Sequence, residues 1–157
     1  MSELPMTMLF HFIGFGMLFT AMLGGMILNN QSKKETDLSR KALLLRATKP
    51  IGLLSPVAVL LILITGIGNM HALGYSLFTV PWLPIKIALF LIASGLGIVF
   101  GAKSRKRAVL VAQMAEGKAA EGSEAQVAKM DSQLSFFFIL QSVFLLVILI
   151  LSVFKPM

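Results

Sequence analysis

The sequence predicts an all-α, polytopic membrane protein built as a bundle of four transmembrane helices. Of its 157 residues, 57% are hydrophobic and only 13% are charged, whereas a soluble domain carries roughly 25% charged residues. The apolar residues fall into four stretches, each close to the roughly 20 residues that a helix needs to cross a hydrocarbon core about 30 Å thick. No stretch alternates with the period of a strand, and lipid tolerates only helices and closed barrels. We expect a single domain over residues 1–157.

The four predicted spans are about residues 6–28, 51–70, 82–102 and 134–154. We interpret the first as a retained helix rather than a signal peptide, because the preceding MSELP has no basic residue and no A-x-A-like site follows the apolar stretch. The fourth, FFFILQSVFLLVILILSVF, has no glycine and is expected to face lipid most. Its two polar residues, Gln141 and Ser142, are expected to point inward.

Small residues predict which faces of the other helices pack together, because close backbone approach drives helix association in lipid. The first span has Gly16, Thr20 and Gly24 at four-residue spacing. The third repeats this spacing with Ala93, Gly97 and Gly101. These faces are expected to lie inside the bundle.

The two longer connections are expected to be partly helical. Ser32 and Glu35 fit a capping box, which predicts a short basic interfacial helix ending at Lys49-Pro50. The third helix is expected to extend to about Ala115. A turn around GKAAEGS would then precede a helix that starts near Ser123.

The positions of lysine and arginine predict the orientation. The first and third connections carry six basic residues each, and the middle one, MHALGYSLFTVP, carries none. Those of the first connection are Lys33, Lys34, Arg40, Lys41, Arg46 and Lys49. Those of the third are Lys103, Arg105, Lys106, Arg107, Lys118 and Lys129. Both basic loops are therefore expected in the cytoplasm, with both termini outside. This placement accounts for the net charge of +7 without a nucleic-acid partner, and it favours a bacterial inner membrane.

Absent residues exclude several function classes. The chain has no cysteine, which removes disulfides, thiolate metal sites and cysteine nucleophiles. No carboxylate lies inside a predicted span, which argues against an acidic proton relay. No Ser/His/Asp set, phosphate-binding loop or HExxH pattern is present.

Two polar residues inside the spans are candidates for function. Lys86 lies two residues after PWLP, about four residues below the predicted outer interface, and shares a face with Ala93 and Gly97. An intramembrane charge indicates function by default, although a lysine this near a helix end can also reach the headgroups. His11 lies in the first span, where it is either a metal or haem ligand or a structural side chain.

Three further groups lie on the same predicted outer side. His71 follows the second span directly after Met70, and Met6 and Met8 precede His11. Imidazole is an axial ligand for haem iron, and thioethers with imidazole suit Cu(I). Taken singly, His71 is typical of a surface residue and the methionines of core filling.

Short motifs resemble the HemJ-type protoporphyrinogen oxidases and the related CopD-like small membrane proteins. The matching pieces are LFHFIGFGMLF, LSPVAVLLILITGI, PWLPIKIALFLI and the terminal ILILSVFKPM. The resemblance implies a haem b and functional roles for the first-helix histidine and third-helix lysine, which are His11 and Lys86 here. The chain departs from HemJ in lacking a tryptophan and arginine in its first helix, and it has DSQLSFFF where an arginine and an Asn-Glu pair would precede the fourth.

Three functions follow from this reading. The leading hypothesis is a redox protein that binds haem b or handles porphyrin, with His11 as axial ligand, Lys86 as anion partner or catalytic residue, and Met70 or His71 as a second ligand. If the chain is an enzyme, it would be an oxidoreductase acting on a tetrapyrrole. The alternatives are an accessory structural subunit and a CopD-like protein that handles copper at the outer face, with ligands from Met6, Met8, His11, Met70 and His71. The sequence leaves open a homo-oligomer or a larger membrane complex.

Overall fold

The computed structural model describes residues 4–77 and 80–154. It contains four long helices, each long and apolar enough to cross a membrane, so the predicted fold class is confirmed. Their bounds are α1 Leu4–Lys34, α2 Leu38–Ala72, α3 Trp82–Ala115 and α4 Ser123–Phe154.

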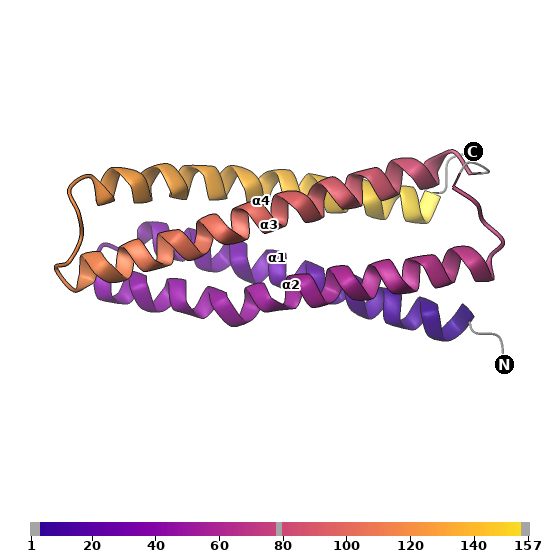
Figure 1. Cartoon of the computed structure of the whole chain (residues 1–157), viewed down its shortest axis with the longest axis horizontal. Helices are drawn as coiled ribbons and strands as arrows, with labels where there is room; N and C mark the ends of the chain where they lie inside the picture. The colour runs from indigo at the N-terminus through magenta and orange to yellow at the C-terminus, as the bar shows by residue number, and fades with distance from the viewer. Residues whose placement is uncertain (1–3, 78–79, 155–157) are drawn as a thin grey trace.

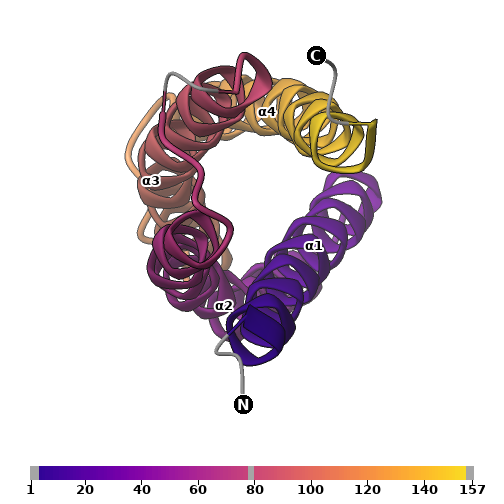
Figure 2. The same cartoon turned by 90° about the vertical axis from the view of Figure 1, so that its right-hand side faces the viewer.

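The helices form a ring in chain order (Figures 1 and 2). Each helix packs against the next, and α1 closes the ring against α4. In the described part of the chain, the backbones of the diagonal pairs α1–α3 and α2–α4 do not approach each other closely, and these helices meet through long side chains such as Arg107 with Asn29 and Lys41 with Asp131. Figure 2 shows that α1 starts beside α2 and approaches α4 only towards its other end.

All four helices are longer than the bilayer requires. A helix of 31 to 35 residues is about 46–52 Å long at 1.5 Å per residue, against a hydrocarbon core of roughly 30 Å. The excess lies at the end that carries the connections 35–37 and 116–122, here called the basic end. The other, called the terminal end, holds the start of α1, the end of α4 and the connection 73–81 (Figure 1).

The predicted break at Pro50 is wrong, because α2 continues through both Pro50 and Pro56. Packing on either side of Pro50 explains this result. Leu45 is 1% exposed in a cluster at the basic end, and Ala58 is fully buried in the main core. Both halves of α2 are held by neighbouring helices, which lets a transmembrane helix tolerate proline.

The predicted capping box at Ser32 is also wrong. Ser32 lies inside α1, is fully buried, and donates its hydroxyl proton to the carbonyl of Asn29 at 2.9 Å. The N-cap of α2 is Asp37, whose Oδ1 accepts from the backbone N–H groups of Ser39 at 2.8 Å and Arg40 at 3.0 Å. At the other connection the predictions hold, since α3 ends at Ala115 and α4 begins at Ser123.

Glycine permits close packing of α1, but not at each predicted position. A Cβ added at Gly14 would lie 2.9 Å from Ile62 on α2, and one at Gly25 would lie 3.0 Å from Phe138 on α4. At Gly16, Gly97 and Gly101 an added Cβ would meet nothing within 4 Å. The predicted small-residue contacts therefore fail at these three positions.

Two apolar clusters fill the ring. The main core includes residues from all four helices: Leu18, Met22, Ala58, Ile62, Phe90, Leu145 and Ile148. A smaller one at the basic end contains Ala42, Leu45, Val111 and Val127. The two polar residues of the fourth span point inward as predicted, since Gln141 is 7% exposed and the hydroxyl of Ser142 contacts the sulfur of Met22 at 3.5 Å.

Candidate functional site

His11 lies on the face of α1 that packs against α2. It is half-buried on the same row as Gly14 and Leu18, which are buried. Its Nδ1 is 2.9 Å from the hydroxyl oxygen of Thr65 on α2. Gly66 lies beside the ring, where an added Cβ would make an ordinary van der Waals contact with the imidazole Cε1 at 3.6 Å.

The hydroxyl of Thr65 determines which nitrogen of His11 carries the proton. Thr65 Oγ1 lies 2.6 Å from the carbonyl oxygen of Leu61, to which it donates its single proton. It can then only accept from His11, so Nδ1 of His11 carries the hydrogen and Nε2 keeps its lone pair. This is the tautomer of a metal-binding histidine whose other nitrogen is held by a neighbouring group.

Lys86 lies on α3 on the row of Trp82, Phe90 and Ala93, all three of which are buried. The Lys86 side chain is half-buried, and its ammonium lies over the Trp82 ring at 5.9 Å from the ring centroid. The charge of Lys86 lies within electrostatic range of the His11 ring. The two predicted residues lie on α1 and α3, whose backbones do not approach each other closely.

The other predicted ligands, which are methionines and His71, are more exposed or lie at the end of α2. Met70 is half-buried and His71 is exposed, both in the last turn of α2. Met6 and Met8 are 56% and 39% exposed. Within residues 4–77 and 80–154, no three His, Asp or Glu side chains come together as a metal site. Asn69 lies one turn beyond Thr65 on α2. Its side-chain carbonyl oxygen, Oδ1, is buried and has no hydrogen-bond partner.

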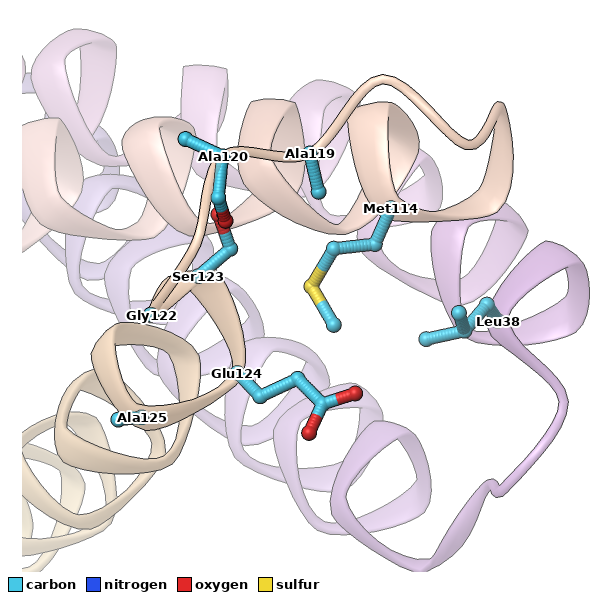
Figure 3. A pocket seen from close by; sticks show the side chains of 8 residues that line it. All are labelled: Leu38, Met114, Ala119, Ala120, Gly122, Ser123, Glu124 and Ala125. Carbon is cyan, nitrogen blue, oxygen red and sulfur yellow. The ribbon is translucent and has the colours of Figure 1, made fainter.

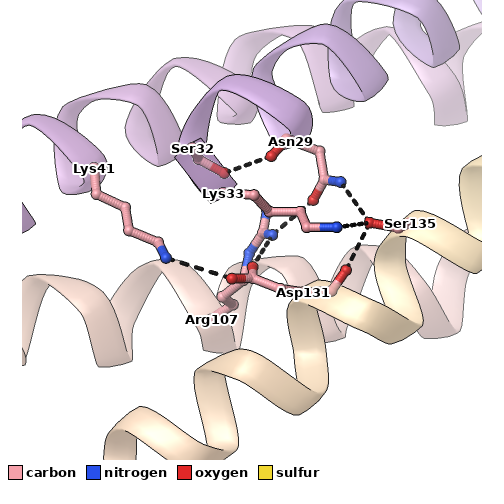
Figure 4. Close-up of polar contacts among 7 residues, drawn as sticks. All are labelled: Asn29, Ser32, Lys33, Lys41, Arg107, Asp131 and Ser135. Carbon is pink, nitrogen blue, oxygen red and sulfur yellow. Dashed lines mark hydrogen bonds and ion pairs between the residues drawn. The ribbon is translucent and has the colours of Figure 1, made fainter. Parts of the chain in front are cut away.

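A polar cluster at the basic end joins all four helices (Figure 4). At its centre is Arg107 of α3, which is 1% exposed. Its Nη1 donates to Asp131 Oδ1 on α4 at 2.6 Å and to Asn29 Oδ1 on α1 at 2.7 Å. Lys41 of α2 lies 3.4 Å from the other carboxylate oxygen of Asp131.

Ser135 extends this cluster one turn along α4. Its hydroxyl donates to the carbonyl of Asp131 at 2.8 Å, and it accepts from Lys33 Nζ at 2.9 Å and from Asn29 Nδ2 at 3.3 Å (Figure 4). The cluster therefore holds α1 and α4 together at the basic end, where Figure 2 shows them approaching each other.

Sequence reasoning missed this cluster because it treated all basic residues of the connections as solvated topology signals. Two signals could have indicated it. Arg107 lies on the row of Phe90, Ala93 and Phe100, continued beyond the apolar part of α3. Asp131 is the acidic residue immediately before the fourth apolar stretch, and a lone acid at such a boundary needs a cationic partner.

Next to this cluster the basic end is hollowed between the start of α2, the end of α3 and the start of α4. Figure 3 shows the outer of two adjoining hollows, about 460 Å³, with Met114, Leu38 and Glu124 around it. The inner hollow, about 220 Å³, reaches Lys41 and Asp131. Glu124 lies in the first turn of α4, where the helix dipole favours a carboxylate, so this acid has a structural explanation.

Comparison with known proteins supports the membrane assignment. The match to a family model described as predicted integral membrane protein (DUF2269) covers residues 6–156. Neither a curated protein nor a solved structure matches the chain. Since the family match covers all four helices, the chain belongs to this family of integral membrane proteins.

Proposed function

We propose that this protein binds haem b through His11 and acts in redox or porphyrin chemistry at the terminal end of the bundle. The single observation that carries the proposal is the hydrogen-bonded chain from Leu61 through Thr65 to His11, which leaves the Nε2 lone pair of His11 available. A histidine that binds a metal is commonly oriented by a group of this kind, which donates to or accepts from its other ring nitrogen.

The donor set fits a haem in two respects. His11 supplies a neutral imidazole at the interface of two helices, where bundle proteins hold cofactors. Lys86 supplies a cation near that imidazole, and a haem propionate is an anion that a cation can pair with. Trp82 lies under the Lys86 ammonium and helps to hold that side chain near the terminal end. When bound, haem iron supplies one-electron chemistry.

The chain's own residues would each have a distinct role. His11 would bind the iron, Thr65 would orient His11, and Lys86 would pair with a carboxylate of the porphyrin edge. Met70 is the half-buried candidate for a second ligand, whereas His71 is exposed. The HemJ-like relationship and the oxidoreductase class are parts of this proposal. The family match itself supports only an integral membrane protein.

The test is a haem titration of the purified protein in detergent, followed by its Soret band and by the fluorescence of Trp82, the single tryptophan. We expect saturable binding in the wild type and its loss in His11→Ala. His71→Ala is the matched control and should bind as the wild type does. Thr65→Val should weaken binding by about 10- to 100-fold, the usual cost of losing an orienting group.

Lys86→Met removes the positive charge but keeps a side chain of similar length, so it tests the charge of Lys86 rather than the folding of the protein. It should weaken binding of haem but not of haem dimethyl ester, which has no free propionate. A Soret band that is unchanged in His11→Ala would refute the proposal. A colourless protein that retains copper would favour the copper-handling alternative, and a colourless, metal-free protein would favour the accessory subunit.

A further inference from the structure

Gln141 is a buried polar group in the middle of the bundle that the proposed haem site does not use. It lies on the inward row of α4 between Phe137 and Leu145, and it is 7% exposed. Its side-chain oxygen, Oε1, has no hydrogen-bond partner. A buried carbonyl oxygen without a partner is costly, so it calls for an explanation such as a water or a ligand.

Gly97 of α3 lies at the same level along the bundle as Gln141 of the neighbouring α4. Three pairs fix the antiparallel register of these helices: Phe100 with Phe137, Lys103 with Gln133, and Arg107 with Asp131. In this register Gln141, one turn after Phe137, lies at the level of Gly97. Gly97 is half-buried on the row of Phe90 and Ala93.

Close packing does not explain this glycine. Intramembrane glycines usually let two helices approach, and Gly14 and Gly25 do so here. A Cβ at Gly97, by contrast, would meet nothing within 4 Å. A half-buried position with open space around it therefore lies at the level of an unpaired acceptor on the neighbouring helix, and the two observations are independent.

The surroundings define what could occupy this position. The helices here are apolar, so a ligand would enter from the lipid. The free acceptor requires an O–H or N–H donor. The rings of Phe100 and Phe137, stacked at 4.5 Å between centroids, lie one turn away and offer a contact for a flat ring.

We propose that Gly97 and Gln141 form a site for the head of a lipophilic phenol, the chemistry shared by reduced isoprenoid quinones and prenylated monophenols. The hydroxyl donates to Gln141 Oε1, and the ring occupies the space beside Gly97. This site is separate from His11, and it does not depend on haem binding.

Equilibrium dialysis in detergent tests the proposal with three probes: a short-chain benzoquinol kept reduced by ascorbate, its monomethyl ether and its dimethyl ether. The wild type should bind the benzoquinol about fivefold more tightly than the dimethyl ether, which is the net contribution of one hydrogen bond. In Gln141→Leu that preference should disappear. Binding of the monomethyl ether as tight as the benzoquinol supports a general phenol site, and weaker binding supports a hydroquinone site.

Two glycine variants provide the matched control on the same helix. Gly97→Leu should abolish binding of every probe, because leucine fills the position. Gly95→Leu should leave binding unchanged, since Gly95 is exposed and also has nothing within 4 Å. His11→Ala should bind the probes normally, which separates failure of this site from failure of the haem proposal.

Three results would overturn the inference. They are the absence of saturable binding to the wild type, equal binding of benzoquinol and dimethyl ether, and a preference that survives in Gln141→Leu. A helical circular dichroism spectrum like that of the wild type shows that each variant is folded. A buried water as the true partner of Gln141 would appear as the first of these results.

Discussion

At the scale of single residues, Arg107 heads the fully buried side chains of the described residues by volume. It carries a full charge at 1% exposure, and its partners Asn29 and Asp131 come from two other helices. Its Nε is buried without a partner, so the arrangement compensates the charge while leaving one donor unpaired. Removing one member of such a pair costs more than the pair itself contributes, because the remaining charge is left uncompensated in a poorly solvated place.

We therefore predict that Asp131→Leu destabilises the protein by about 3–5 kcal/mol. The double variant Arg107→Met with Asp131→Leu should recover most of that loss, because it removes the charge as well as its partner. Thermal unfolding in detergent, followed by circular dichroism, measures both effects.

The control for this experiment is the exposed ion pair between Lys118 and Glu116, whose side chains are 73% and 54% exposed. Glu116→Gln should change stability by less than about 0.5 kcal/mol. If Asp131→Leu is no worse than Glu116→Gln, the cluster in Figure 4 does not hold the basic end together.

At the scale of helices, Asp37 controls where α2 begins. The backbone N–H groups of Arg40 and Ser39 donate to its carboxylate, and they hold the pKa of Asp37 below its ordinary value. Because the folded pKa is lowered, the cap contributes its full stabilisation above the unfolded pKa of about 4. This stabilisation is lost as the pH falls through the lower folded value.

Hydrogen exchange at the first turn of α2 tests this prediction. At neutral pH, Asp37→Ala should exchange several-fold faster than the wild type, whereas Asp37→Asn should stay close to it because asparagine also caps. As the pH falls below about 4, the wild type should approach the alanine variant. The asparagine variant should not, since its side chain does not titrate. Identical exchange in all three proteins at neutral pH would mean that the cap does not matter.

The existence of the four helices could be predicted from the sequence, but several of their ends could not. Hydropathy detects only the apolar part of a helix, so the first span was expected to end near residue 28, whereas α1 runs to Lys34. The local signals at Ser32 and Pro50 were each typical of a helix boundary. Tertiary packing overrides both, because Ser32 is fully buried near the end of α1, and Leu45, five residues before Pro50, packs against Val111 and Val127 of the neighbouring helices.

The residues of the candidate sites also differ in whether the sequence could identify them. His11 and Lys86 could be identified because polar residues are rare in an apolar span. Thr65 could not, because its importance depends on a contact between residues 54 positions apart. Arg107 was hidden among other basic residues, and what distinguishes it from exposed neighbours such as Lys106 is that it continues the buried face of α3 beyond the apolar stretch.

At the scale of the whole molecule, the two ends differ in charge. Twelve of the 14 lysines and arginines lie in or beside the basic end, and the connection 73–81 carries none. A single helical fold with this asymmetry has a preferred orientation, because basic segments are retained in the cytoplasm. We therefore predict that His11 and Lys86 lie on the outer side of the membrane and Arg107 on the cytoplasmic side. The outer position of the proposed haem site therefore depends on this orientation.

Labelling of single cysteines can determine the orientation, since the chain has no cysteine of its own. Ala120, in the turn between α3 and α4, and Leu77, in the connection between α2 and α3, are both exposed. In intact bacterial cells, a membrane-impermeant maleimide should label Leu77→Cys but not Ala120→Cys, and permeabilised cells should show both. The reverse pattern would place His11 and Lys86 on the cytoplasmic side, where a ligand would have to arrive from the cytoplasm. Labelling of both positions in intact cells would mean that the charge asymmetry does not set one orientation.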